Sequence, residues 1–214
     1  MKTKTLVSID LDFFNDQKQP LSKLQKLLKH IPRRTPAVVT VEHHEFIPQL
    51  QKWIKSGRVK TPFNIINIDK HHDYYYNVAP YHPEGTEINC GNWGFRLPIE
   101  WYNRYTWVYG NYYNDWSDWP EAEKWLADRG IQYSTRKKHR LDSLKTKFVA
   151  VVACISPDYL CKNMQDNVIQ AINIVANYFK LSKAPKFTNN TDIINVEGWR
   201  ITPRPFLKTL HDTE

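Results

Sequence analysis

Carboxylates and a histidine gather where one apolar run ends. Residues 63–68 (FNIINI) predict a buried strand, and Asp69, His71 and Asp73 follow it directly. In an extended segment, residues two apart point to the same side, so we expect these three side chains to share one side. Two carboxylates and an imidazole make half of a divalent-metal site. Carboxylate oxygens suit Mg and Mn, and the imidazole moves the preference toward Mn, Fe, Co or Zn.

A second acidic pair lies near the N-terminus. Residues 5–14 (TLVSIDLDFF) predict a strongly apolar strand in which Asp10 and Asp12 share one face. Burial of two carboxylates is costly unless a positive charge lies beside them, and a pair of metal ions would supply that charge. The alternative for both clusters is a set of solvated carboxylates at strand ends and in polar loops.

A pair of histidines follows a third apolar run. The β-branched strand predicted at 37–41 ends in Glu42-His43-His44-Glu45, where a helix is expected to begin. Ligands of open α/β sheets lie at the carboxyl ends of the strands, so an imidazole here can complete a binuclear site. Either His43 or His44 can be the ligand. We favour His44, because its longer reach past Glu42 places it at the helix start.

The elements that position these clusters alternate along the chain. Strands are predicted at 5–14, 37–41, 63–68, 147–155 and 192–196, and helices at 20–29, 46–56, 120–130 and 165–179. This alternation predicts an α/β fold with three layers, a mostly parallel sheet with helices on both faces. With 214 residues, a single domain over 1–214 is expected.

Composition excludes several classes of protein. An apolar fraction of 41% with 14% aromatic residues excludes disorder, and there is no apolar run of transmembrane length. Because no signal peptide precedes the first strand, we expect a cytoplasmic protein without a membrane partner. Cys90, Cys154 and Cys161 show no C-x-x-C spacing, so neither a disulfide framework nor a structural zinc site is predicted.

Charge and aromatic content bear on the partner. The net charge is +8, and its densest basic run is 136–140 (RKKHR). Such runs are more often solvated faces than phosphate contacts, and no nucleic-acid-binding motif accompanies this one, so nucleic acid is not the expected partner. Residues 74–119 are rich in Tyr and Trp, which either line a groove for a peptide, sugar or base, or belong to the core.

Together the motifs resemble those of the ureohydrolase superfamily, the arginases and agmatinases. The matching residues are S-x-D-x-D at 8–12, D-x-H-x-D at 69–73 and the acidic-histidine pair near His44. Residues 9–14 (IDLDFF) and 156–159 (SPDY) look closer to an atypical branch that includes the peptide arginases, which convert arginine to ornithine in ribosomal peptides. In ordinary arginases S-x-D-x-D follows D-x-H-x-D. The resemblance therefore implies an arginase-like fold with a rearranged strand order.

The resemblance also implies two Mn ions and a role for each matching residue. One ion would be held by His44, Asp69, Asp73 and Asp10, and the other by His71, Asp69, Asp10 and Asp12. Asp73 would also act as the catalytic proton acceptor, and Glu197, beyond the last strand, would pair with the guanidinium. The family's proton-shuttle histidine belongs to a His-Gly pair, and its nearest match here is Cys90-Gly91. Either the shuttle is dispensed with, or His82 supplies it. Substrate contacts are expected from Tyr74 and Asn92.

The function expected from this resemblance is Mn-dependent hydrolysis of the guanidinium group of arginine side chains in a peptide, giving ornithine and urea. The expected partner is an arginine-containing peptide with an acidic leader, which the charge of +8 would attract. Two alternatives stay open. One is another binuclear metallohydrolase, such as an amidase, deacetylase or phosphoesterase, and the other is a peptide or nucleic-acid binding protein without catalysis.

Overall fold

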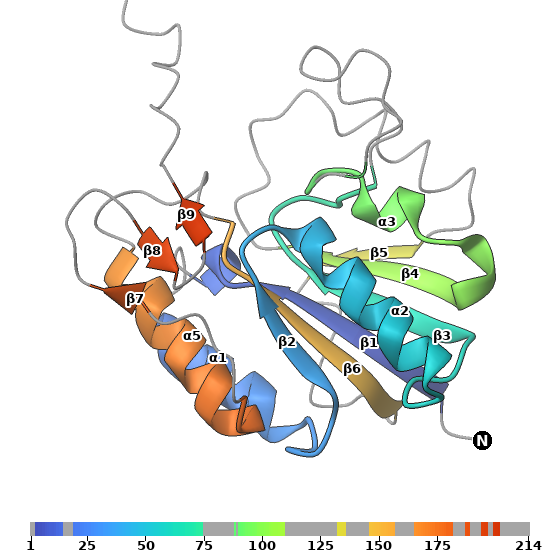
Figure 1. Ribbon diagram of the computed structural model, residues 1–214, viewed down its shortest axis with the longest axis horizontal. Helices are drawn as coiled ribbons and strands as arrows, with labels where there is room; N and C mark the ends of the chain where they lie inside the picture. Colours follow the sequence, from blue (N-terminus) through green and yellow to red (C-terminus); the bar gives the residue numbers. More distant parts are fainter. Residues whose placement is uncertain are drawn as a thin grey trace, which may run out of the picture.

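Six parallel strands form the main sheet of the protein. The computed structural model describes residues 3–14, 19–74, 88, 90–109, 132–135, 146–156, 165–181, 187–188, 194–196 and 199–201. The strands of the sheet are β1 (Thr3–Asp10), β2 (Ala37–Thr40), β3 (Phe63–Ile68), β4 (Tyr102–Tyr109), β5 (Gln132–Thr135) and β6 (Thr146–Cys154). Their order is β2-β6-β1-β3-β4-β5, and every neighbouring pair is parallel (Figure 1). This is an α/β fold, as the sequence predicts.

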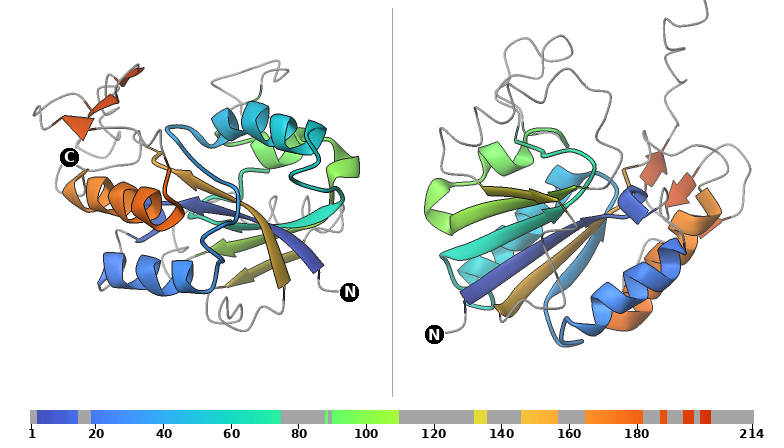
Figure 2. Two further views of the ribbon diagram at one scale, coloured as in Figure 1. Left: turned by 60° about the horizontal axis from the view of Figure 1, so that its bottom comes forward. Right: turned by 180° about the vertical axis from the view of Figure 1, so that it is seen from behind.

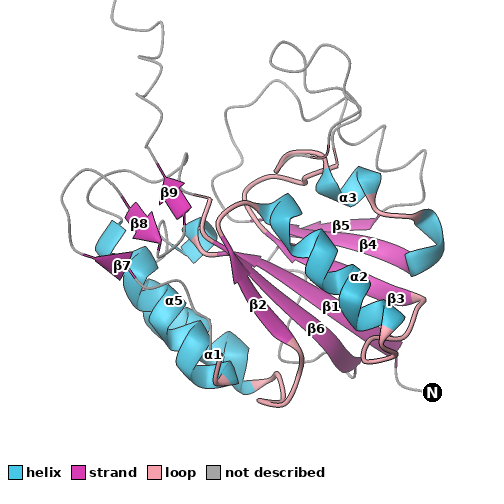
Figure 3. Cartoon of the chain, viewed as in Figure 1, coloured by secondary structure: helices cyan, strands magenta, loops and turns pink. Residues whose placement is uncertain are grey.

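Helices cover both faces of this sheet (Figures 2 and 3). The helices are α1 (Pro20–Lys29), α2 (Ile47–Lys55), α3 (Trp93–Arg96) and α5 (Gln165–Phe179), with 3-10 turns η1 (Asp12–Phe14), η2 (His43–Phe46) and η3 (Ile99–Trp101). Leucines of α1 and apolar residues of α5 share one core with Val7 and Ile9 of β1. The opposite core joins Leu6 of β1 to Leu50 of α2 and Trp93 of α3. The alternation of side chains along β1 thus builds two cores, one on each face.

A smaller antiparallel sheet lies near the C-terminal end of the sequence. It consists of β7 (Phe187–Thr188), β8 (Ile194–Val196) and β9 (Trp199–Ile201) in that order. The strand predicted at 192–196 corresponds to β8. The helix predicted at 120–130 and the basic run at 136–140 lie outside the described residues.

The observed strands near the site differ from the predicted ones at β1 and β4. The first predicted strand is too long: β1 ends at Asp10, and the chain turns into η1 at Asp12. This turn places the consecutive residues Phe13 and Phe14 in the same core, which the two-sided alternation of a strand cannot do. The second difference is β4, which sequence analysis left unassigned within the aromatic stretch. Its Tyr105 and Trp107 are fully buried, so the described aromatic residues of that strand belong to the core.

The connections after β1 and β3 leave the sheet toward opposite faces. After β1 the chain continues to α1 on one face, whereas the next α-helix described after β3 is α3, on the other face. In open α/β sheets, ligands bind at the carboxyl ends of neighbouring strands whose connections diverge in this way. Within the described part of the chain, no helix has both the length and the apolar character needed to cross a membrane.

Candidate metal centre

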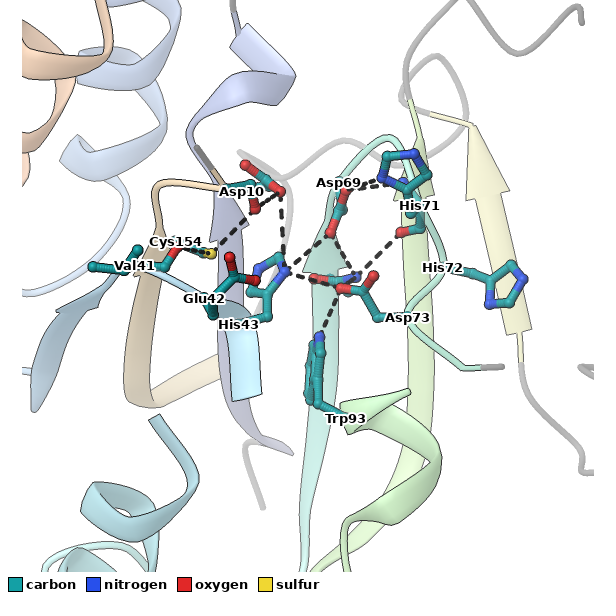
Figure 4. Close-up of polar contacts among 12 residues, drawn as sticks. Asp10, Val41, Glu42, His43, Asp69, His71, His72, Asp73, Trp93 and Cys154 are labelled. Atoms are coloured by element: carbon teal, nitrogen blue, oxygen red, sulfur yellow. Dashed lines mark hydrogen bonds and ion pairs between the residues drawn. The ribbon is translucent and has the colours of Figure 1, made fainter. Parts of the chain in front are cut away.

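A buried cluster of acidic and histidine side chains lies at the carboxyl ends of these strands (Figure 4). It combines residues from the carboxyl ends of four strands: Asp10 from β1, His43 after β2, Asp69 after β3 and Cys154 from β6. Asp73, four residues beyond Asp69, completes it. Because all of these strands run parallel, their carboxyl ends lie at the same edge of the sheet, which is why segments distant in sequence meet here.

The pleat of the strands points these side chains toward α2 and α3. In β1, Leu6 belongs to the core under α2, and Asp10, four residues later, faces the same side of the sheet. In β3 the same relation holds between Ile65 and Asp69. Residues two apart along a strand face the same side, so the cluster continues that core with polar side chains at the edge of the sheet.

His43 is the centre of the cluster. Its Nδ1 lies 3.0 Å from Oδ2 of Asp73, 3.3 Å from Oδ2 of Asp69 and 4.0 Å from Oδ2 of Asp10. All four side chains are buried. The turn η2, which carries His43, is fixed by a reciprocal capping box between Glu42 and Glu45. A buried imidazole is thereby held against three carboxylates.

Asp73 is held in place by an unusual backbone and by two donors. Its φ of 52° is left-handed, so the segment after Asp69 is not the extended strand that the sequence argument assumed. The Trp93 indole donates to Oδ2 of Asp73 at 2.6 Å, and the Asn67 amide donates to the same oxygen at 3.2 Å. The backbone turn carries the Asp73 carboxylate back toward Asp69.

Gly94 allows this turn to pack closely. A Cβ at Gly94 would lie 2.9 Å from the carbonyl oxygen of Asp73 and 2.8 Å from the ring of Tyr105. The Gly94 N–H donates to that same carbonyl at 2.9 Å. A side chain at position 94 would therefore force the Asp73 backbone or the neighbouring Tyr74 and Tyr105 rings to shift.

The two neighbouring histidines of the loop occupy different environments. The side chain of His71 is 34% exposed, and its Nδ1 lies 3.7 Å from Oδ1 of Asp69 at the rim of the cluster. His72 is buried against Trp107, and its Nδ1 accepts the Tyr74 N–H at 2.9 Å. Burial lowers the pKa of His72 to about 3, so this imidazole is neutral and supports the loop.

Cys154 and Ser156 extend the cluster beyond Asp10. The Ser156 hydroxyl donates to Oδ2 of Asp10 at 2.7 Å, and the Cys154 thiol donates to the carbonyl of Val41 at 3.2 Å. Burial raises the pKa of the Cys154 thiol well above its ordinary value, so it remains protonated while no cation is near. Neither Cys154 nor Ser156 is predicted from the sequence to lie in the site, because Cys154 has no metal-binding spacing to the other cysteines. The register of β1 with β6, which pairs Asp10 with Cys154, brings them there.

Burial also sets the protonation of the two loop carboxylates. It raises the pKa of Asp73 to about 6, although the hydrogen bonds from Trp93 and Asn67 act in the opposite direction. The pKa of Asp69 is raised as well, first by burial and then by the charge of Asp73. Two buried carboxylates this close thus retain a proton more readily than exposed ones unless a cation binds between them.

The donor set fits a divalent cation. Ligand atoms of His43, Asp69 and Asp73 lie within 4.8 Å of one another, and so do those of Asp10, His43 and Cys154. Imidazole nitrogen with carboxylate oxygen suits Mn, Fe, Co or Zn, and a thiol adds affinity for the softer of these ions. The hydroxyl of Ser8 and the amide oxygen of Asn67 are buried without a hydrogen-bond partner among the described residues. The cluster therefore has the composition of a metal site.

The structure brings part of the predicted ligand set together. Asp10, Asp69 and Asp73 come together around a histidine, with His71 at the rim. The histidine among the carboxylates is His43, whereas the sequence argument favoured His44. His44 follows one residue later in the 3-10 turn, and burial lowers its pKa.

Of the other predicted residues, those whose side chains the structure describes lie outside the cluster. Tyr74 is 2% exposed, and its hydroxyl bonds to that of Tyr102 at 2.6 Å, a core position rather than a substrate-facing one. Asn92 is buried at the start of α3, and Cys90 is half-buried before it. The backbone of Asp12 opens η1, and its side chain is outside the described part of the chain. His82 and Glu197 also lie outside the described residues.

Comparisons with models of protein families, with curated proteins and with solved structures find no match to this chain.

The raised pKa of Asp73 predicts a pH-dependent stability of the metal-free protein. Its folded value of about 6 lies above the ordinary 3.8, so its stabilising contribution is complete below about pH 4 and is lost as pH rises through 6. The loss amounts to roughly 3 kcal/mol of unfolding free energy. We expect metal-free Asp73→Asn, which keeps the shape without the charge, to gain stability relative to the unmodified protein between pH 4 and 7. If the denaturation midpoints of the two proteins differed by the same amount at every pH in this range, the raised pKa of Asp73 would be contradicted.

Proposed function

We propose that this protein is a metal-dependent hydrolase of the ureohydrolase type, which cleaves the guanidinium group of an arginine side chain in a peptide to give ornithine and urea. The observation that carries the proposal is the buried contact of His43 with Asp69 and Asp73, beside Asp10, at the carboxyl edge of a parallel sheet. These acidic residues belong to the S-x-D-x-D and D-x-H-x-D motifs that resemble the arginases. An arginase-like fold with a rearranged strand order, in which the S-x-D-x-D strand comes first, is part of the proposal.

The residues divide into ligands and groups that hold them. Asp10, His43, Asp69 and Asp73 would hold one ion, and His71 at the rim, with Asp69, Asp10 and Asp12, would hold the second. When bound, two Mn ions supply Lewis acidity and bring the pKa of a water toward about 7. Asn67 and Trp93 orient the Asp73 carboxylate through its Oδ2, as Ser156 does for Asp10.

Acid–base chemistry falls to Asp73 in this proposal. Its buried carboxylate lies beside the residues that would hold the ions, so it would take a proton from water and pass it to the departing amine. Burial of the site excludes bulk water, which strengthens every charge interaction within it.

Metal analysis and urea release test the proposal together. The purified protein is expected to contain Mn, or to bind it from solution, and to release urea from an arginine peptide with formation of an ornithine residue detected by mass. An exposed-site variant, Asp166→Ala at the start of α5, serves as the active control. Bound metal without urea from any arginine substrate would favour another binuclear metallohydrolase. Absence of metal binding would favour a binding protein without catalysis.

An arginine within a polypeptide is expected to be a better substrate than free arginine. A protein with a net charge of +8 repels a small cation over about one Debye length, whereas a peptide with an acidic leader is attracted to it. We expect kcat/KM for such a peptide to exceed that for free arginine by about a hundredfold at low salt, and by less at high salt. Free ornithine and the ornithine-containing peptide, quantified separately by mass in competition between the two substrates, measure the ratio. Equal or faster turnover of free arginine would assign the protein to small-molecule ureohydrolases.

A further inference from the structure

A pocket lies at the amino-terminal edge of the sheet, opposite the metal centre. It has a volume of about 740 Å³, within the range of small-ligand and peptide sites. Five basic side chains line it: Lys4 of β1, Lys147 of β6, Arg34 before β2, and Arg58 and Lys60 before β3. Among the described residues that line this basic pocket, none is acidic.

Helix ends do not account for this concentration of charge. The helices α1 and α2 end at the pocket, where His30 and Gly57 line it, and each helix C-terminus carries about half a negative charge. Two such ends offset about one of the five positive charges, so roughly four remain. The Arg58 guanidinium also packs over the ring of Trp53, 5.8 Å from its centroid, which fixes one cation in position. The basic pocket therefore carries a net positive charge and favours the binding of an anion.

The composition of the pocket selects among anions. Many compact phosphate sites add backbone N–H groups of a helix N-terminus to their Lys and Arg side chains, whereas this pocket receives helix C-termini, which disfavour a compact anion beside them. Single-stranded nucleic acids bind to exposed aromatic platforms, but Phe148 is half-buried and the Trp53 face is covered by Arg58. Separate cations arranged around a pocket with apolar walls suit carboxylates spaced along a polypeptide.

We propose that the basic pocket binds an acidic segment of the same peptide whose arginine enters the metal centre. This inference rests on the proposed function for the identity of the peptide. Lys4 lies six residues before Asp10 in β1, which places the two sites about 20 Å apart at about 3.3 Å per residue. An extended chain needs more than about six residues to span this distance around the sheet. Binding at the pocket would raise the local concentration of the arginine at the metal centre.

The binding step is tested with an arginine-free probe. A fluorescently labelled peptide rich in Glu and Asp is titrated with the full-length protein, and its anisotropy is followed. The pocket variant Arg34→Glu with Lys147→Glu is compared with a control, Lys26→Glu with Lys52→Glu, on exposed positions of α1 and α2 outside the pocket. Both variants change the net charge by the same amount. Any difference between them therefore reports the pocket and not the overall field.

We expect the pocket variant to bind the probe at least about tenfold more weakly and the control variant to change affinity by less than about threefold. A second pocket pair, Lys60→Glu with Lys147→Glu, should reproduce the loss, with unchanged thermal unfolding. Equal losses in pocket and control variants would overturn the proposal, because binding would then depend on net charge alone. A labelled single-stranded oligonucleotide could also bind more tightly than the peptide and lose this binding only in the pocket variants. That result would overturn the proposal in favour of a nucleic-acid ligand.

Turnover tests the link between the two sites. Arginine peptides carry the acidic segment either about three or about twelve residues from the arginine, below and above the span of about six residues. A lower KM for the longer spacer, lost in the pocket variant and retained in the control, is expected. Equal KM values for the two spacers would overturn the link. Failure of every peptide to release urea would contradict the proposed function. The binding measurement with the arginine-free probe would still show whether the pocket binds an acidic peptide.

Discussion

Asp69→Ala is expected to lose bound divalent metal and all hydrolytic activity. Asp69 is fully buried. Its Oδ2 lies 3.3 Å from Nδ1 of His43, and its Oδ1 accepts the His71 backbone N–H at 2.8 Å, so its carboxylate contacts both the central histidine and the histidine at the rim. Loss of a residue that only supports a ligand already weakens metal binding about 10–100-fold, so loss of this carboxylate should weaken Mn binding by at least about a hundredfold. Elemental analysis after dialysis and urea release measure the two effects.

The fold of this variant is expected to survive. Burial raises the pKa of Asp69, so its charge does not stabilise the metal-free protein, and its removal should leave the unfolding temperature without metal similar or higher near neutral pH. Asp10→Ala should behave in the same way toward metal, and the exposed Asp166→Ala is the matched control. Two equivalents of tightly bound Mn in either Asp69→Ala or Asp10→Ala would show that the ligand set is wrong.

The two adjacent histidines are expected to respond very differently to substitution. His43→Gln removes the imidazole that lies 3.0 Å from Asp73, so Mn affinity should fall by about a hundredfold or more. His44→Gln makes the same chemical change one residue later, and its affinity should stay within about threefold of the unmodified protein. Isothermal titration with Mn distinguishes them. The reverse order of effects would restore the assignment to His44 that the sequence favoured.

The convergence of the acidic clusters could be predicted from sequence because it depends on strand ends alone. Asp10 and Asp69 each follow an apolar run, and the carboxyl ends of parallel strands lie at one edge. The choice of histidine depends on a smaller detail. In the 3-10 turn η2, successive side chains point about 120° apart, so the residue at which the turn begins decides which imidazole faces the carboxylates. The capping box that sets this start is formed by residues on both sides of the pair, and its effect on direction is visible only in three dimensions.

Other parts of the site depend on contacts that no local pattern encodes. Ser156 meets Asp10 through a pairing between strands about 140 residues apart, and the left-handed Asp73 depends on Trp93 and Gly94. The strand β4 escaped prediction because aromatic residues take the core positions that aliphatic residues fill in β1 and β3. Sequence thus indicates the edge and the acidic ligands, while tertiary packing selects the histidine and the supporting groups.

The strand order has a consequence for how the chain folds. The strand β6 lies between β1 and β2, so it separates the first two strands of the sequence, and its register pairs Asp10 with Cys154 and Thr40 with the same residue. His43 therefore reaches its place beside Asp10 only after residues 146–154 have been made and inserted between the two strands. Contacts of this kind give a high contact order, which slows folding. During synthesis the acidic ligands would be complete long before the sheet that aligns them, so cation capture should be a late event, coupled to closure of the central strands.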